Sequence, residues 1–143
     1  MKIKFLNNLA KMPQRGSTSA AGFDIYSANS EPIVIKTRET TKIPTGFATE
    51  IPEGYFAAVF PRSGMATKLG LRLANCVAVI DSDYRGEWLV PLYNDSSDER
   101  VIEPGTRIAQ FVVIPYIAPD LELTDNLKNT DRGVGGFGST GTN

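Results

Sequence analysis

A polar turn near the middle of the chain carries side chains suited to hold a flat ligand and to activate water. An apolar run ends at Ile80 and is followed by Asp81, where partial burial would make the carboxylate a useful general base. Tyr84 offers a flat ring, and Asn75 offers both a donor and an acceptor. The alternative is a turn in which the aspartate and serine side chains hydrogen-bond to their own backbone. A role for the aspartates in metal binding also stays open, although the calcium-loop pattern is absent.

Two further segments offer groups that bind phosphate. In residues 61–68 (PRSGMATK), the Ser63 hydroxyl and free backbone N–H groups at the start of a short helix would form a phosphate cradle. The alternative is that Ser63 simply caps that helix. Near the end of the chain, Arg132 precedes a glycine-rich stretch whose backbone N–H groups can approach phosphate closely.

That glycine-rich stretch matches a dinucleotide pattern only in letters. Residues 133–138 read G-x-G-x-x-G, but five residues remain after them, too few for the helix that this motif must open. Ser139 stands where a phosphate-binding loop needs lysine. Phe137 has no local core to join and would stack on a flat ligand as part of a lid; a flexible tail is the alternative reading.

Composition excludes several classes of function. The chain has 143 residues, enough for one domain, and no histidine, which removes every histidine base or ligand. Its single cysteine, Cys76, permits no internal disulfide and is expected to be a small core residue. With 15 basic and 16 acidic residues, the chain favours neither nucleic acid nor a membrane surface. It has no secretory signal and no membrane-length apolar run, so we expect a soluble, cytoplasmic protein.

The elements that must position these groups are mostly strands. One short helix is expected at 64–69. Alternating segments and short apolar runs predict strands at 2–6, 32–36, 55–60, 71–80, 88–93, 106–114 and 120–124, with residues 21–28 also reading as a strand. Many short strands separated by turn signals favour a sandwich, jelly roll or barrel. In such strands a lone Asp24 or Gln110 would not stand out.

Five segments in order resemble the five motifs of the trimeric deoxyuridine triphosphate nucleotidohydrolases, the dUTPases. They cover nearly the whole chain, and the second, third and fifth are distinctive. The segments are AGFDIYSA at 21–28, PRSGMATK at 61–68, NCVAVIDSDYRGE at 75–87, RIAQF at 107–111 and RGVGGFGSTG at 132–141.

The resemblance implies an all-β fold: a jelly-roll-like β-barrel subunit at 1–125 with one short helix, and a flexible glycine-rich C-terminal arm at 126–143. It implies a homotrimer with sites between subunits, each closed by an arm. The implied reaction is hydrolysis of dUTP to dUMP and pyrophosphate by water attack on the α-phosphorus. Mg²⁺ would be held mainly by the triphosphate and water. This reaction keeps uracil out of DNA and supplies dUMP for thymidylate synthesis.

The resemblance also implies a role for each matching residue. Asp81 would orient and deprotonate the attacking water, Tyr84 would pack under the deoxyribose, and Asn75 would read the uracil edge. Asp24 would support the phosphate and metal region through water or Arg62. The residues that would hold phosphates are Arg62, Ser63, Gly64, Gln110, Arg132 and Ser139, while Phe137, beside Gly138, would stack on uracil.

One residue departs from the family pattern, and two other functions remain open. Ala78 stands where the family usually has glycine, and its methyl group would either crowd the base pocket or face the core. A dCTP deaminase shares the implied fold, although the strand ending at Asp81 and the arm favour a dUTPase. A regulatory protein that binds dUTP as a signal would use the same site.

Overall fold

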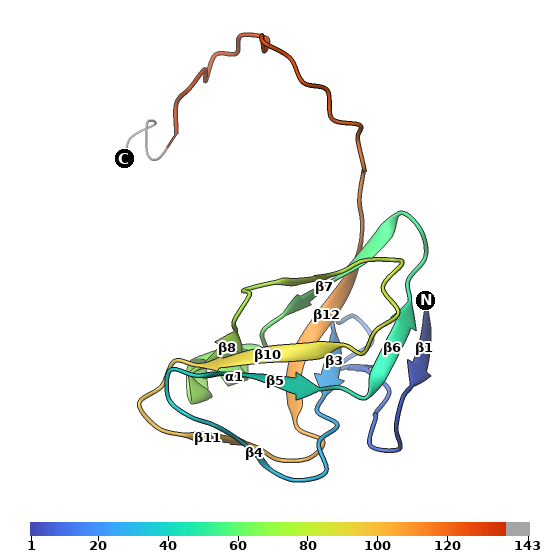
Figure 1. Ribbon diagram of the computed structural model, residues 1–143, viewed down its shortest axis with the longest axis vertical. Helices are drawn as coiled ribbons and strands as arrows, with labels where there is room; N and C mark the ends of the chain where they lie inside the picture. The colour runs from blue at the N-terminus through green and yellow to red at the C-terminus, as the bar shows by residue number, and fades with distance from the viewer. Residues whose placement is uncertain (137–143) are drawn as a thin grey trace.

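The computed structural model describes residues 1–136 and consists of short strands with a single helix (Figure 1). This arrangement confirms the all-β expectation. The helix is α1 (Ser63–Leu69). The strands are β1 (Lys2–Phe5), β2 (Gln14–Arg15), β3 (Phe23–Tyr26), β4 (Ile33–Ile35), β5 (Thr40–Pro44), β6 (Phe47–Glu50), β7 (Tyr55–Phe60), β8 (Leu71–Leu73), β9 (Ala78–Ile80), β10 (Leu89–Asn94), β11 (Arg100–Ile102) and β12 (Arg107–Pro115).

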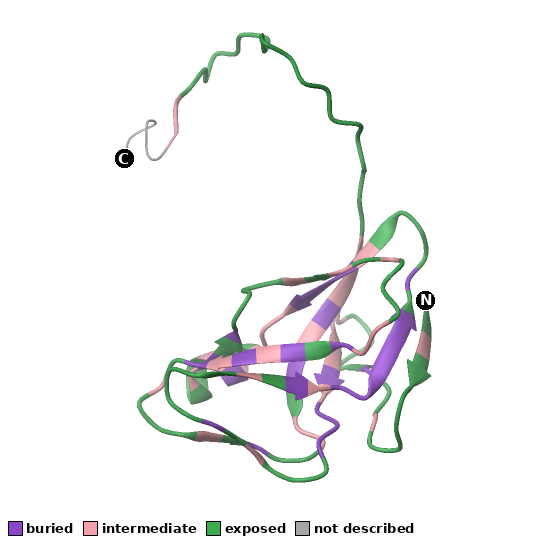
Figure 2. Ribbon diagram, in the orientation of Figure 1, coloured by how far each residue is buried: buried purple, intermediate pink, exposed green. Residues whose placement is uncertain are grey.

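Two antiparallel sheets enclose the core in a jelly-roll-like arrangement. The larger sheet has the strand order β2-β3-β12-β7-β9, and the smaller has the order β5-β10-β8. Two ribbons, β1-β6 and β11-β4, complete the fold. Apolar side chains from both sheets form one buried cluster, and the buried segments in Figure 2 lie where the strands come together. Burial of these side chains is the main force that holds the sheets together.

An aromatic group anchors the polar turn to this core. Trp88 is 1% exposed, and its ring lies 5.2 Å from Phe47 and 5.1 Å from Phe111. The tilted and edge-on geometries are those that aromatic quadrupoles prefer. Since Trp88 directly precedes β10 and follows the turn that begins at Asp81, its packing fixes the C-terminal side of that turn.

The residue that caps the start of α1 is not Ser63, as the alternative reading of residues 61–68 expects. Arg62, with φ −86° and ψ 138°, occupies the cap position, and no side chain caps the helix there. Ser63 is already helical, so its role as the capping residue is wrong. At the other end, Gly70 ends the helix in the left-handed conformation at φ 66°, and its N–H donates to the carbonyl of Met65.

The apolar run predicted as one strand at 71–80 is interrupted by a turn between β8 and β9. The N–H of Cys76 donates to the carbonyl of Leu73 at 3.3 Å, and that of Val77 donates to Asn75 at 2.6 Å. Cys76 adopts a positive φ of 59° and is exposed. The prediction that it lies in the core is therefore wrong, because the chain reverses where the sequence pattern continues.

The strand predicted at 120–124 is also wrong for this chain. No strand forms there, and Leu121 and Leu123 are 95% and 99% exposed. Beyond Ile117 the described chain runs away from the sheets without regular structure (Figure 1). The alternating pattern of this segment has no partner strand among residues 1–136. Four strands lay outside the predicted segments: β2, β5, β6 and β11.

Candidate active site

Asp24 lies between two arginines that come from other parts of the chain. It accepts hydrogen bonds from Nε of Arg62 at 2.8 Å and from an Nη of Arg107 at 3.1 Å, one at each carboxylate oxygen. Its side chain is 13% exposed, against 26% for Arg62 and 51% for Arg107. We call Asp24, Arg62, Arg107 and Gln110 the arginine–aspartate cluster; with one carboxylate and two guanidinium groups it keeps a net positive charge, as binding of an anion requires.

Strand register builds this cluster. Gln110 in β12 pairs with Asp24 in β3 on one side and with Phe60 in β7 on the other. Arg62 follows two residues after Phe60, and Nε2 of Gln110 donates to the carbonyl of Pro61 at 3.1 Å. The structure therefore brings together three of the predicted site residues, Asp24, Arg62 and Gln110, with Ser63 and Gly64 following in sequence. A Cβ at Gly64 would meet open space.

Asn75, Asp81 and Tyr84 form a second group around a cavity of ≈ 270 Å³, which Ala78 and Trp88 also line. The Tyr84 hydroxyl donates to the carbonyl of Glu87 at 3.0 Å. A side chain at Gly86 would displace the Tyr84 ring, so glycine there lets the ring keep this position. Asn75, Asp81 and Tyr84 thus lie around one cavity, which Leu89 and Pro91 of β10 also line.

The predicted partial burial of Asp81 is wrong for the single chain, where Asp81 is exposed. The reason is topological: the carboxylate follows an edge strand, β9, that pairs only with β7. Any desolvation of this carboxylate must come from a bound ligand or from another copy of the chain.

Arg85 holds the turn in shape and was not singled out by the sequence. One Nη donates to the carbonyls of Ser82 at 2.7 Å and Tyr84 at 3.1 Å, and reaches Thr49 in β6 at 3.5 Å. Its place in the segment 75–87 was the only signal available.

The arginine–aspartate cluster and the Asp81 turn lie far apart in one chain. Both belong to the five-stranded sheet, but β3 and β9 are three strand spacings apart. Asp24 is level with Phe60, whereas Asp81 follows Ile80, the partner of Ala57. At about 4.8 Å per strand and about 3.3 Å per residue, their backbones are separated by about 20 Å. The structure does not bring these two groups together.

Arg132 lies on the extended segment, where its Nε donates to the carbonyl of Gly135 at 2.9 Å. It contacts neither of the two groups described above. The predicted residues Phe137, Gly138 and Ser139 lie outside the described residues.

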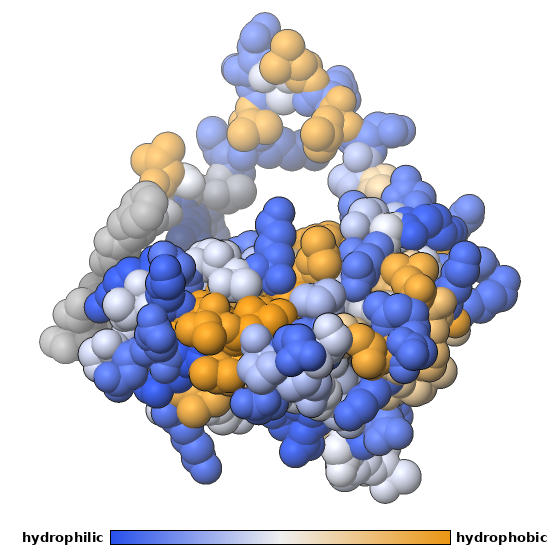
Figure 3. Space-filling view, turned by 60° about the horizontal axis from the view of Figure 1, so that its bottom comes forward, coloured by the Kyte–Doolittle hydropathy of each residue, from blue (hydrophilic) through white to orange (hydrophobic). Residues whose placement is uncertain are grey.

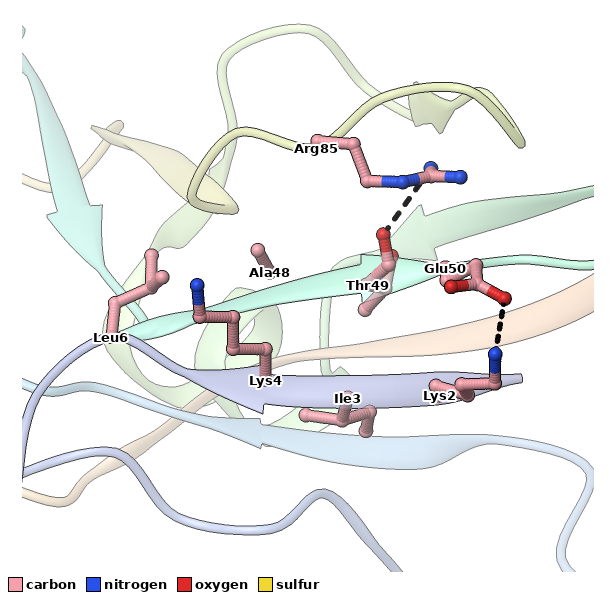
Figure 4. Close-up of a pocket in the computed structure, with 8 residues that line it drawn as sticks. All are labelled: Lys2, Ile3, Lys4, Leu6, Ala48, Thr49, Glu50 and Arg85. Carbon is pink, nitrogen blue, oxygen red and sulfur yellow. Dashed lines mark hydrogen bonds and ion pairs between the residues drawn. The ribbon is translucent and has the colours of Figure 1, made fainter.

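A hollow on another part of the surface contains none of the predicted residues. It has a volume of ≈ 390 Å³ and lies over β1 and β6, where Lys4, Ala48 and Arg85 are among the residues that line it (Figure 4). At its edge Lys2 donates to Glu50 at 2.7 Å and holds the pKa of that carboxyl below its ordinary value. Its carboxylate, Glu50, is paired with Lys2, and no amide or aromatic side chain of residues 1–136 lines the hollow beside it, so we place the chemistry elsewhere.

Within residues 1–136 no group of three or more histidine, cysteine, aspartate or glutamate side chains is arranged to hold a metal ion. Both oxygens of Asp24 are already engaged by arginines. No helix in the described part of the chain is long and apolar enough to cross a membrane.

Comparison with known proteins shows which family most of the chain resembles. The dUTPase family model matches residues 8–141. A deoxyuridine 5'-triphosphate nucleotidohydrolase of Desulfitobacterium hafniense is 49% identical over 92% of this chain and 87% of its own length. One from Rickettsia bellii is 46% identical over 99% of this chain and 95% of its own length.

Solved structures give the same answer. The dUTPase of Staphylococcus bacteriophage 80alpha with dUPNHPP superposes with a TM-score of 0.91 at 31% identity, covering 99% of this chain and 98% of that one. A dUTPase mutant from phage phi11 of S. aureus, described with a structural Mg(II) ion, superposes with a TM-score of 0.82 at 26% identity over 90% of this chain and 98% of its own. The chain therefore belongs to the dUTPase family of nucleotide hydrolases.

Proposed function

We propose that the chain hydrolyses dUTP to dUMP and pyrophosphate by attack of water on the α-phosphorus. The observation that carries the proposal is the cavity that places Asn75, Asp81 and Tyr84 around one space. An amide to read a base edge, a ring for a sugar and a carboxylate to take a proton are the groups this reaction needs. In a cell the reaction would keep uracil out of DNA and supply dUMP for thymidylate synthesis.

The phosphates would bind at the arginine–aspartate cluster. Arg62 commits Nε to Asp24 and one Nη to the carbonyl of Arg107 at 3.4 Å, which leaves the other Nη for phosphate oxygens. Gln110 would contact the phosphates near the α position, and Ser63 and Gly64 would add a hydroxyl and an N–H. From the arm, Arg132 and Ser139 would hold the far phosphate while Phe137, next to Gly138, stacks on uracil.

Mg²⁺ would enter on the triphosphate, held by phosphate oxygens and water. The engagement of both Asp24 oxygens by arginines supports this arrangement, because that carboxylate is not free to bind the ion. The ion would neutralise phosphate charge that a chain of net charge −1 cannot offset alone.

We further propose that each active site is shared between copies in a homotrimer. Asp81 must lie beside the α-phosphorus that Gln110 also contacts, yet the two groups are separated by about 20 Å in one chain. The Asp81 turn of one copy would therefore meet the arginine–aspartate cluster of another. Such a contact would also cover the exposed Asp81 carboxylate and raise its strength as a base.

Apolar side chains on the extended segment support assembly. Ile117, Leu121, Leu123 and Leu127 are 90%, 95%, 99% and 86% exposed. Figure 3 shows hydrophobic side chains spaced along this segment as it leaves the sheets. Four large apolar groups in water are costly for a monomer, and another subunit is the cover that a homo-oligomer supplies.

A parallel assay of two products tests the proposed reaction. The chain is incubated with Mg²⁺ and dUTP, dCTP, dTTP or UTP, and both pyrophosphate and ammonia are measured. We expect pyrophosphate from dUTP alone, with UTP inert because Tyr84 leaves no room for a 2′-hydroxyl. Ammonia from dCTP would replace the proposal with a deaminase, and binding of dUTP without either product would replace it with a dUTP-dependent regulatory protein.

Replacing Ala78 with glycine tests whether its methyl group shapes the base pocket. Ala78 lines the same cavity as Asn75 and Tyr84, and the alternation of β9 places it on the same face as Ile80. Loss of one methyl group enlarges a pocket and typically changes discrimination about 10-fold or more. We expect the ratio of kcat/KM for dUTP over dTTP to fall about 10-fold in Ala78→Gly. An unchanged ratio would show that the methyl group serves the core instead.

A further inference from the structure

A bulge in β12 turns one arginine toward the arginine–aspartate cluster. Gln110 pairs with Asp24 and Ala109 pairs with Ile25, so strict alternation would pair Ile108 with Tyr26. Instead Arg107 pairs with Tyr26, and the register shifts between Arg107 and Ala109. Ile108 is the extra residue that a bulge accommodates.

The bulge decides which face of the sheet Arg107 occupies. In an unbroken strand Arg107, three positions from Gln110, would lie on the opposite face, which is the core face. Both Ile108 and Ala109 are fully buried, so the bulge places two consecutive side chains in the core. Arg107 then lies on the same face as Gln110 and Asp24. This is why the alternating sequence pattern gave no reason to single it out.

Arg107 contacts Arg62 by two routes. Its guanidinium binds the Asp24 oxygen that Arg62 leaves free, at 3.1 Å, and its backbone carbonyl accepts from an Nη of Arg62 at 3.4 Å. Asp24 is largely buried and is held from both sides. A carboxylate held at both oxygens keeps a fixed orientation, and a fixed carboxylate sets the direction of the guanidinium it binds.

We propose that Arg107 is a positioning residue that acts through Asp24 to hold Arg62 in the orientation that receives the phosphates. This inference rests on the proposed function. The bulge at Ile108 is the device that makes the position available, since bulges next to active sites re-aim side chains. Arg107 itself is half-exposed and need not touch the nucleotide.

The test compares Arg107→Ala and Arg107→Lys with Arg100→Ala, a control that removes an arginine bound to the carbonyl of Leu69 away from the cluster. Affinity is measured by titration with the dUTP analogue dUpNHpp (also written dUPNHPP). The values of kcat and KM for dUTP and the melting temperature of each variant are measured as well. We expect Arg107→Ala to weaken binding about 10-fold with little change in melting temperature, Arg107→Lys to recover part of the loss, and Arg100→Ala to match the parent.

A double-variant cycle separates positioning from direct contact. If Arg107 acts through Arg62, Arg107→Ala should have no further effect on binding in an Arg62→Ala background, because coupled residues are not additive. If the losses of dUpNHpp affinity in the two single variants multiply in the double variant, Arg107 contacts phosphate directly and the proposal is overturned. An affinity of Arg107→Ala within about twofold of the parent would also overturn it.

A readout without nucleotide keeps this inference distinct from the proposed function. The Nε–H NMR signal of Arg62, assigned by its absence in Arg62→Lys, reports the ion pair with Asp24 in the free protein. We expect it to shift and exchange faster in Arg107→Ala. An unchanged signal would overturn the positioning role even if dUTP is hydrolysed, whereas a parent protein that hydrolyses no dUTP would overturn the proposed function alone.

Discussion

Asp81→Asn should abolish turnover of dUTP while leaving nucleotide binding close to that of the parent. Asparagine keeps the size and hydrogen-bonding oxygen of the side chain but cannot accept the proton of the attacking water. Loss of a general base typically costs about 10²- to 10⁴-fold in rate, so we expect kcat to fall about 10³-fold. Steady-state pyrophosphate release and titration with dUpNHpp measure the two effects separately.

The matched control is Asp98→Asn, which makes the same carboxylate-to-amide change at an exposed aspartate between β10 and β11. It should hydrolyse dUTP at the rate of the parent. If Asp81→Asn retains more than about a tenth of the parent kcat, Asp81 is not the base, because a proton acceptor contributes more than that.

Removing residues 132–143 should leave a folded protein that hydrolyses dUTP very poorly. Every strand ends by Pro115, so no strand pairing in the described chain depends on the deleted residues. The deletion removes Arg132, Phe137 and Ser139, the groups proposed to hold the far phosphate and the base and to exclude bulk water. We expect kcat/KM to fall at least about 100-fold, since closure of such a segment completes the site.

Deleting only residues 142–143 provides the control, because the family model ends at residue 141. That variant should behave as the parent in the same pyrophosphate assay. Parent-like turnover by the longer deletion would remove the arm from the mechanism. A melting temperature well below that of the parent would instead give the arm a structural role, although every strand of residues 1–136 ends by Pro115.

The sequence predicted the Asp81 turn because its residue types carry chemistry on their own. Asn75, Asp81 and Tyr84 lie within ten positions, so the short strand β9 and the turns on either side of it keep them close in space. Asp24 and Gln110 were recognised only through the family motifs. Their contact depends on pairing between β3 and β12, whose partners are more than 80 positions apart in the chain.

The remaining errors come from interactions that local patterns do not encode. Cys76 sits in an apolar run, but hydrogen bonds of the turn place it at the surface. Arg107 reaches Asp24 only because of a bulge that breaks the alternation. Segment 120–124 has the alternation of a strand, yet a strand also needs a partner edge, and no strand within residues 1–136 supplies one.

Mixing two inactive variants tests the shared-site account most directly. Arg62→Ala disables the arginine–aspartate cluster, and Asp81→Asn disables the turn. If the two groups of one site come from different copies, subunits exchanged at equal amounts will contain about a quarter of sites with both groups intact. The account predicts that dUTP hydrolysis, absent from either variant, returns to about a quarter of the parent activity after exchange. If a mixture of confirmed hetero-oligomers stays inactive, both groups of each site belong to one chain and the account is contradicted.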